Sequence, residues 1–456
     1  MPQERPDMQE VIHLIEAAGF DKVRVAVADI DGILRGKLMS LDKLRSAAEK
    51  GFGFCDVVFG WDMNDAAYDN VQVTGWHTGY PDAQATLAPE TFREIPWEDG
   101  LPMILGDFRK AAGHLADICP RTLLASVKQQ AQDMGYQAMF SQEFEWFNFR
   151  HYEQELFDER RHKPQPMSEG MFGYSVLRSS QHSDFFQALF DQLTEFGVPL
   201  EGLHTETGPG VLEAAIHYAD VMEAADRAIL FKTGTKEIGI RFGILASFMA
   251  KWNASLPGCS GHLHQSLWDD EGNNLFYNIK YDHAISQLMQ QYIAGQMHCL
   301  PHILPMYAPT VNSYKRLVEG AWAPTTITWG IDNRTTALRV IGGSPSGMRL
   351  ETRVCGSDAN PYLAMAAALA SGLYGIKHQL ELGTPPVKGN GYASEGLGSL
   401  HHNLYDAATA MKASPIAREM FGDAFVEHFT NTRIWEWRQY SKAVTDWELK
   451  RYFEII

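Results

Sequence analysis

The hydrophobic pattern of the first hundred residues changes its period from one short segment to the next. Residues 7–20 carry apolar side chains at helical spacing, and the pattern ends at a glycine. Residues 23–40 instead alternate apolar and polar side chains on both sides of Asp31-Gly32, which predicts two strands joined by a turn. Helical spacing returns over residues 41–51. Together these segments predict a small mixed α/β module.

Helical and strand patterns continue to alternate through the rest of the chain. A helix begins at Pro120 and ends at Gly135, a strand follows at residues 138–149, and a long helical pattern covers residues 218–243. This alternation is typical of an α+β domain in which helices cover a sheet.

The boundary between the small module and the large domain is expected just before Pro120. We therefore divide the chain into an N-terminal domain, residues 1–112, and a large domain, residues 113–456. The longest run of small apolar residues, 362–376, is too short to span a bilayer, which takes about 20 residues. It predicts a buried helix, and no membrane partner is expected.

The charge balance and the cysteines narrow the class of protein. The 456-residue chain has 39 basic and 56 acidic residues and a formal net charge of -17, which disfavours a nucleic-acid partner. Its five cysteines are odd in number and far apart, without a C-x-x-C pair, so we expect a reducing, cytoplasmic location. The N-terminus is charged and lacks the apolar core of a signal peptide.

The strand at residues 138–149 contains the first candidate site. Side chains alternate faces along a strand, so Glu143 and Glu145 share one face while Phe144 and Trp146 share the other. Two neighbouring carboxylates repel each other unless a cation lies between them. On its own, however, the same pattern also fits a strand that faces solvent.

Other polar residues flank turns or share strand faces. Glu206 and Glu213 flank a Gly-Pro-Gly turn that can bring them together, although two exposed loop acids fit the pattern as well. His262, His264 and Ser266 share a strand face after a glycine-containing loop, which favours close approach of the backbone to a ligand.

The C-terminal half adds a glutamate among several arginines. These candidates are Arg316, Arg334, Arg339, Arg349, Glu351 and Arg353. Ligand sets rich in oxygen, with little nitrogen and no sulfur, favour Mg²⁺ or Mn²⁺ over zinc. Metal ions beside arginines are typical of phosphoryl transfer, because both neutralise phosphate charge. An ordinary ion-pair ladder would also explain the segment "RLETRV" alone.

In their order along the chain, these motifs resemble the glutamine synthetase family. The matching segments run from "DIDGILRGK" through "PRTLL", "EFE", "FMAK", "SGHLHQSL", "NSYKRLV" and "NRTTALR" to "RLETRV" and "NPYLA", and they cover nearly the whole chain. The resemblance implies a small β-grasp-like N-terminal domain and a large catalytic domain with an antiparallel sheet covered by helices. It also implies homo-oligomers of stacked rings, as dodecamers, in which neighbouring subunits share each active site.

The family reaction uses ATP to phosphorylate the side-chain carboxylate of L-glutamate, and an amine nitrogen then attacks the γ-glutamyl phosphate. The ligands of one metal ion match Glu145, Glu206 and Glu213. The ligands of a second ion, which bridges the nucleotide phosphates, match Glu143, His262 and Glu351. The positions that bind glutamate match Gly258, Arg316 and Arg353. The arginines that stabilise the transferred phosphoryl group match Arg334 and Arg339, and the nucleotide side matches His264, Ser266 and Arg349.

The sequence departs from ammonia-using members of the family around the nitrogen nucleophile. Those members carry, in a "PGYEAP" loop, a glutamate that closes the site and assists loss of the ammonium proton, and here Trp322 occupies its position. A stretch that helps bind ammonium from the neighbouring subunit is replaced by residues 58–70, which contain Trp61 and Asp62. The two acids around the Gly-Pro-Gly turn are also one residue closer together than in the ammonia-using pattern.

A different nucleophile explains these departures, since the glutamate, ATP and metal motifs are intact. A Trp in place of Glu removes a charge and supplies a ring that attracts an alkylammonium by roughly 0.5–2 kcal/mol. We therefore expect a γ-glutamyl-amine ligase whose amine pocket contains Trp61, Asp62 and Trp322, with Asp62 as the candidate base. Asp65 and Asp69 offer further anionic anchors, which favours a polyamine such as putrescine over a monoamine.

Two other functions stay open. An ammonia-dependent glutamine synthetase fits the segment around Tyr405, which resembles one that carries a regulatory, modified tyrosine in some members. In that case Glu319, three residues before Trp322, would replace the missing glutamate through a shifted loop. A non-catalytic structural relative is the other alternative, although a scaffold has no need of intact metal and arginine motifs.

Overall fold

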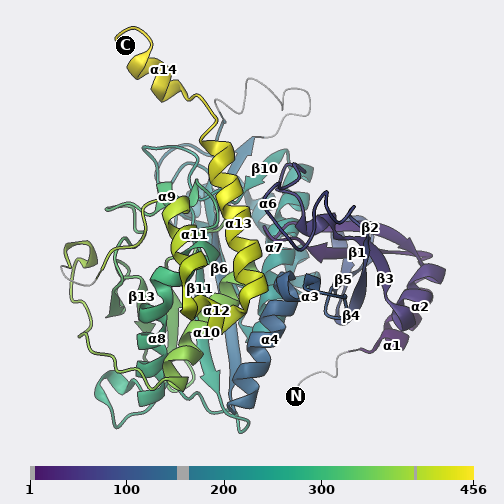
Figure 1. Ribbon diagram of the computed structural model, residues 1–456, viewed down its shortest axis with the longest axis horizontal. Coiled ribbons are helices and arrows are strands. Elements are labelled where there is room, and N and C mark those ends of the chain that lie inside the picture. Colours follow the sequence, from purple (N-terminus) through teal and green to yellow (C-terminus); the bar gives the residue numbers. More distant parts are fainter. Residues whose placement is uncertain (1–5, 151–163, 395–397) are drawn as a thin grey trace.

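Two sheets organise the molecule, and the expected α+β fold is confirmed. The computed structural model describes residues 6–150, 164–394 and 398–456. Among these residues a five-stranded sheet is followed along the chain by a nine-stranded sheet. In Figure 1 the small sheet, in purple, lies beside the large one, and helices surround the large sheet.

The small sheet has the strand order β2-β1-β5-β4-β3, and only the neighbours β1 and β5 run parallel. Its helices and strands are α1 Met8–Ala17, β1 Lys22–Ala28, β2 Leu34–Ser40, α2 Leu41–Lys50, β3 Phe52–Cys55, β4 Asp82–Ile95 and β5 Leu101–Asp107, with short 3₁₀ turns at Asp56–Phe59 and Pro96–Glu98. The turn between β1 and β2 contains Gly32, whose φ is +77° and whose missing Cβ would lie 2.9 Å from Asn360 Cα. Glycine satisfies both the left-handed backbone and this close approach.

The large sheet has the order β12-β13-β14-β11-β6-β8-β7, with β9 and β10 also paired to β6. Its strands are β6 Gln137–Arg150, β7 Leu200–Thr205, β8 Val211–Ile216, β9 Ala219–Asp220, β10 Ile244–Ser247, β11 Gly261–Trp268, β12 Trp329–Ile331, β13 Leu338–Ile341 and β14 Arg349–Thr352. Every pair is antiparallel except β12 with β13. The long strand β6 lies at its centre and therefore positions the strands on both sides.

Helices pack against this sheet and form the remainder of the chain. They are α3 Leu115–Ile118, α4 Pro120–Asp133, α5 Val176–Gln181, α6 Ser183–Glu195, α7 Val221–Arg241, α8 Gln287–Ile303, α9 Ser313–Arg316, α10 Pro361–Lys377, α11 Leu404–Ala413, α12 Pro415–Phe421, α13 Asp423–Tyr440 and α14 Asp446–Tyr452, with 3₁₀ turns at Asp282–Ala284, Leu304–Met306 and Gly391–Ala393. The apolar helix α10 is buried along almost its whole length, as its sequence predicts. The last helix, α14, projects from the body in Figure 1.

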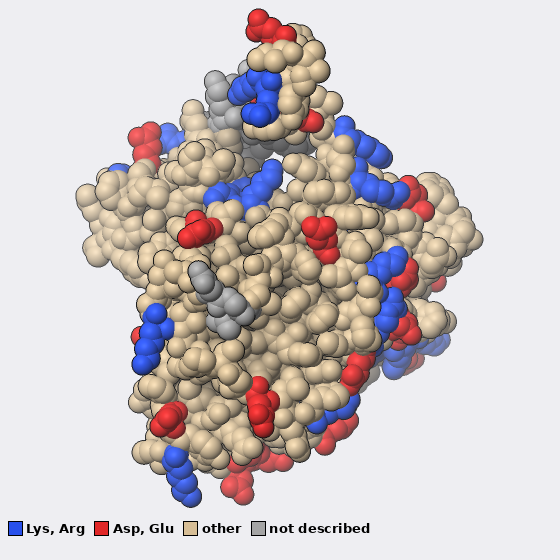
Figure 2. Space-filling model, turned by 60° about the vertical axis from the view of Figure 1, so that its left-hand side comes forward, with Lys and Arg blue, Asp and Glu red and all other residues tan. Residues whose placement is uncertain are grey.

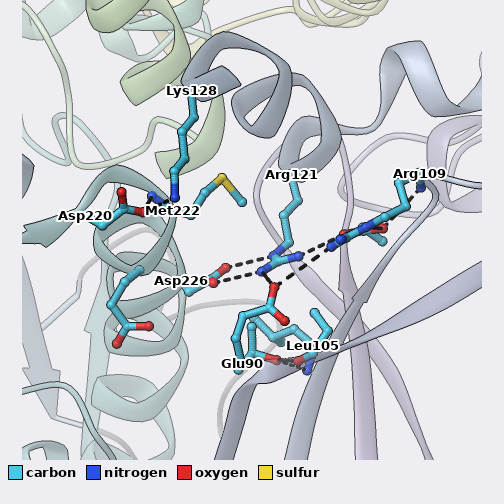
Figure 3. Close-up of polar contacts among 12 residues, drawn as sticks. Glu90, Leu105, Arg109, Arg121, Lys128, Asp220, Met222 and Asp226 are labelled. Carbon is cyan, nitrogen blue, oxygen red and sulfur yellow. Dashed lines mark hydrogen bonds and ion pairs between the residues drawn. The ribbon is translucent and has the colours of Figure 1, made fainter. Parts of the chain in front are cut away.

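A buried arginine joins the small sheet to helices α4 and α7 (Figure 3). Arg121 of α4 is 2% exposed and donates to both carboxylate oxygens of Asp226 on α7, each at 3.0 Å. It also donates to Asp107 of β5 at 2.8 Å and to Glu90 of β4 at 2.9 Å. Tyr362 adds a 2.6 Å hydrogen bond to Asp226. A buried guanidinium paired on all sides fixes the position of the small sheet on these helices.

The charged surface and the state of the cysteines agree with what the composition indicates. On the face drawn in Figure 2, basic and acidic side chains are interspersed over a largely uncharged surface. All five cysteines are free. No helix in the described ranges is long and apolar enough to cross a membrane. The expected domain division at residues 112 and 113 falls between β5 and α3.

Candidate active site

Strand β6 supplies the centre of the candidate site. Phe144 and Trp146 are fully buried in the hydrophobic core. Glu143 and Glu145 alternate with them and line a cavity of about 450 Å³ on the other face. The two-residue period of the strand therefore separates the core-forming rings from the carboxylates.

The register of the sheet brings distant segments to the same cavity. His262 on β11 lies opposite Glu143, and Glu213 on β8 lies opposite Glu145. Beyond β11, Glu351 on β14 also lines the cavity. These five residues come from four strands, so their proximity depends on correct pairing of the whole sheet.

One cluster of ligand atoms consists of Glu143, His264 and Glu351, which lie within 4.8 Å of one another. His264 Nε2 is 2.9 Å from Glu143 Oε2, and His262 Nδ1 is 3.2 Å from Glu351 Oε1. Burial alone would raise the pKa of Glu351, but the neighbouring His262 and Arg353 outweigh it and lower this pKa to about 2. His264, expected on the nucleotide side, thus directly contacts a residue expected to bind metal.

A second cluster consists of His204, Glu206 and Glu213, again within 4.8 Å. His204 Nε2 is 3.1 Å from Glu213 Oε1, and the ring of Tyr174 stacks on His204 with the centroids 4.3 Å apart. His204 and Tyr174 are not among the site residues predicted from the sequence. The available signal for His204 was its position two residues before Glu206, which directly follows the end of β7.

The residues present fit divalent cations. Burial raises the pKa of Glu145, and burial together with the neighbouring Glu143 carboxylate raises that of Glu213. In addition, His262 Nε2 and Glu206 Oε2 are buried without a hydrogen-bond partner among the described residues. Crowded carboxylates and unpaired lone pairs are both stabilised by a cation, and an oxygen-rich set without thiolate matches Mg²⁺ or Mn²⁺.

A buried cationic wall closes one side of the same cavity. Arg316 is 3% exposed and donates to the backbone oxygens of Val354 and Arg353, each at 2.9 Å. Arg353 Nε is buried and has no partner in the described structure, so it can donate to a bound carboxylate. Gly258 also lines the cavity, and a Cβ there would lie 2.5 Å from Ala250 O and 2.9 Å from Arg316 Cγ.

Two further arginines reach the cavity from the segment around β13. Arg339 donates to Glu351 at 2.9 Å and to Asp332 at 3.0 Å through Nε. Arg334 lines the cavity from an exposed position. Both are placed to face a charged group bound between the carboxylates and the cationic wall.

The residues expected on the nucleotide side line a neighbouring cavity of about 310 Å³. His264, Ser266 and Arg349 contribute to it together with Glu143, which also lines the larger cavity. Arg349 Nε donates to His264 Nδ1 at 3.2 Å. Glu143 therefore lies between the two spaces, where a metal ion would contact ligands bound in both.

Trp322 stands at the open side of the 450 Å³ cavity. Its side chain is 62% exposed and lines the cavity next to Ala321. Its φ of +55° lies in the left-handed region, and its carbonyl accepts a 3.4 Å hydrogen bond from Arg353. Glu319 is exposed and is not among the residues that line this cavity.

Within one chain, the structure does not bring Trp61 and Asp62 to Trp322. Asp62 lines a different cavity of about 1070 Å³, and its carboxylate accepts hydrogen bonds from the backbone of Asn64 and Ala66 at 2.8 and 3.0 Å. The Trp61 ring instead lies 5.1 Å from the guanidinium carbon of an arginine, Arg35.

The comparison with known proteins agrees with this geometry. The sequence model of the glutamine synthetase catalytic domain matches residues 117–452. The chain belongs to the glutamine synthetase family. Type-1 glutamine synthetase 2 of Dictyostelium discoideum is 49% identical over 98% of this chain and 86% of its own length. Glutamate–isopropylamine ligase of a Pseudomonas species is 35% identical over 100% of this chain and 99% of its own.

A solved structure titled as a GmaS/ADP complex extends the comparison to the fold. It has a TM-score of 0.84 and 27% sequence identity, covering 97% of this chain and 99% of that chain. The resemblance expected from the motifs is therefore confirmed, and the protein is a ligase of the glutamine synthetase family. Glutamate, ATP and divalent metal ions fit this family. One of the two relatives is named a glutamine synthetase and the other a glutamate–isopropylamine ligase, however. The nitrogen donor of this protein must therefore be inferred from the residues of its own site.

Proposed function

We propose that the protein is an ATP-dependent ligase that joins the γ-carboxylate of L-glutamate to an organic amine through γ-glutamyl phosphate. The observation that carries this proposal is Trp322, whose exposed ring lines the cavity where ammonia-using members place a glutamate. An aromatic ring packs on a carbon chain and attracts an alkylammonium through cation–π contact. The similarity to a glutamate–isopropylamine ligase supports the same reading.

The cationic wall is proposed to bind glutamate. Arg316, Arg353 and Gly258 lie together at one side of the cavity, and the free Arg353 Nε gives one unused donor for a carboxylate. Arg334 and Arg339 are proposed to stabilise the transferred phosphoryl group, because they face the same space from the β13 side. The γ-carboxylate of glutamate would then lie between Arg316 and Arg353 on one side and Arg334 and Arg339 on the other.

Divalent ions are proposed to be held by two sets of residues. One set is Glu145, Glu206 and Glu213, and the other is Glu143, His262 and Glu351. His204 and His264 contact members of these sets and would orient them. When bound, Mg²⁺ or Mn²⁺ neutralises phosphate charge, while His264, Ser266 and Arg349 border the space proposed for the nucleotide.

Deprotonation of the amine by Asp62 depends on assembly. In one chain Asp62 is 9% exposed and its Oδ2 accepts a 3.2 Å hydrogen bond from Trp435 Nε1, in a cavity separate from that of Trp322. The ring-shaped homo-oligomer implied by the family resemblance is proposed to bring Trp61 and Asp62 of one subunit to the cavity of the next. Mixing Asp62→Asn subunits with Arg339→Gln subunits tests this, because shared sites would regain activity in the mixture and separate sites would not.

The function itself is tested by a panel of nitrogen donors with phosphate detection at fixed glutamate and ATP. We expect phosphate release to depend on an alkylamine, with ammonia a poor substitute. Ammonia outperforming every organic amine would establish the second candidate, glutamine synthetase, which the 49% identical relative favours. Absence of turnover with every donor would indicate a non-catalytic relative.

A further inference from the structure

A second cavity, of about 660 Å³, adjoins the reaction cavity at Trp322. Trp322 and Arg334 line both spaces. The ion pair between Arg339 and Asp332 also joins them, since Arg339 lines the first cavity and Asp332 lines the second. A substrate whose nitrogen reacts beside Trp322 therefore has room for a carbon tail on the far side of this ring.

The second cavity has a fixed wall with apolar side chains. Ile331, Pro386 and Val387 line it together with the Trp322 ring. Asn333 Nδ2 holds the wall in place by donating to the carbonyls of Val387 at 3.0 Å and of Gly389 at 2.9 Å. Val387 N also donates to Trp329 O at 2.9 Å. These polar groups are thus used within the protein, and the side chains of Ile331, Pro386 and Val387 remain for contact with hydrocarbon.

The charges around this cavity are unfavourable for a second ammonium group. Arg334, Lys388 and His283 line it. Asp332 is the one carboxylate among its described lining residues, and both Nε and a terminal nitrogen of Arg339 donate to it, at 3.0 and 2.5 Å. Both bonds end on Asp332 Oδ1, so this single carboxylate already pairs with Arg339, and a polyamine tail would meet more cationic than anionic groups here.

The acids expected to anchor a diamine are also engaged elsewhere. Asp65 accepts a 2.7 Å hydrogen bond from Arg35, and Asp69 pairs with Arg438. Asp62 is buried by its own loop and Trp435. Within one chain none of these three acids lines either cavity at Trp322, so none of them anchors a diamine there.

We propose that the cavity lined by Ile331, Pro386 and Val387 receives the uncharged carbon tail of the amine, and that the enzyme prefers monoamines with an apolar tail to diamines. This inference rests on the proposed function, because it assigns the tail of the amine that reacts at Trp322. It names Val387 as a residue that determines specificity.

The test compares n-butylamine with putrescine, which have the same carbon chain and differ by one terminal ammonium group. We expect kcat/KM for n-butylamine to exceed that for putrescine by at least about tenfold, because the second ammonium group would lie beside Arg334 and Lys388. Equal rates, or a preference for putrescine, would overturn the inference while leaving the amine-ligase function intact. Ammonia exceeding both would instead overturn the proposed function.

Two variants of the apolar wall make the test specific. Val387→Asp is expected to raise kcat/KM for putrescine relative to n-butylamine by about tenfold, since it supplies the missing anion. Val387→Asn has a similar size without the charge and is expected to leave the ratio near that of the wild type. The backbone hydrogen bond of Val387 to Trp329 is retained in both. If both variants change the two rates in the same proportion, Val387 does not contact the tail and the inference is wrong.

Discussion

The two halves of the reaction cavity are built differently. In the half proposed for glutamate and metal ions, the key side chains come from paired strands and buried segments: Glu351 is 1% exposed, Arg316 3% and Arg353 5%. In the half proposed for the amine, Trp322 is 62% exposed and has a φ of +55°.

This difference shows where the fold constrains the chemistry. Each buried group is held by at least one hydrogen bond or ion pair, so moving one disturbs its neighbours. The Trp322 side chain is instead carried by a loop, and the contact that holds its position is a backbone carbonyl accepting from Arg353. Substitution of such a ring changes what the cavity accepts without disturbing the sheet. We therefore expect the nucleophile, rather than glutamate activation, to be the adjustable part of this enzyme.

The largest effect is expected from Glu351→Gln. This change removes the charge that pairs with Arg353 at 2.6 Å and Arg339 at 2.9 Å, and it weakens the proposed ion site. We expect kcat/KM to fall roughly a thousandfold with every amine, and titration with Mn²⁺ followed by calorimetry to show weaker binding. The matched control is Glu319→Gln, on the exposed loop outside the cavity lining. Unchanged Mn²⁺ binding in the Glu351 variant would show that Glu351 is not a ligand.

A smaller effect, confined to the glutamate half, is expected from Gly258→Ala. The added Cβ would displace Arg316, because Arg316 Cγ lies 2.9 Å and Ala250 O 2.5 Å from its position. A shift of about 1 Å in a substrate-positioning group costs up to roughly a hundredfold, so KM for glutamate should rise while the ranking of amines stays the same. Gly383→Ala is the control, since nothing lies within 4 Å of its Cβ position. A changed amine ranking would show that the two halves are not separable.

The sequence predicts the strand-borne half better than the loop-borne half. Alternation along β6 suffices to place Glu143 and Glu145 on one face. It cannot place His204 beside Glu213, because that contact depends on the pairing of β7 with β8. The hydrogen bond from Trp435 to Asp62 is also inaccessible to sequence reasoning, since Trp435 lies far along the chain. The left-handed backbone of Trp322 follows from no local propensity, because large residues rarely adopt it.

The smallest predicted effect concerns pH and separates the scaffold from the cavity. His428 of α13 is 2% exposed, and burial together with Arg433 lowers its pKa from 6.5 to about 4. The unfolded chain then binds more protons than the folded one, so stability falls as pH drops from about 6.5 towards 4, by about 1 kcal/mol at pH 5.5.

His428→Gln is expected to lose most of this pH dependence, measured as the urea midpoint at pH 7.5 and 5.5. The exposed His402→Gln serves as the control and is expected to behave like the wild type. An equal fall in midpoint for all three proteins would assign the pH dependence to other groups. If the wild type also loses activity below pH 6 and His428→Gln keeps its activity there, unfolding caused by His428 explains the loss, and a titrating group in the cavity does not.

The most direct test of the central claim is the selectivity of Trp322→Glu between ammonia and n-butylamine. If Trp322 sets the nucleophile, the ratio of kcat/KM for ammonia to that for n-butylamine rises by about tenfold, while KM for glutamate and for ATP stays near the wild-type values. Trp322→Phe keeps an aromatic ring and should retain the amine preference. An unchanged ratio in Trp322→Glu, with normal glutamate and ATP binding, would contradict the account.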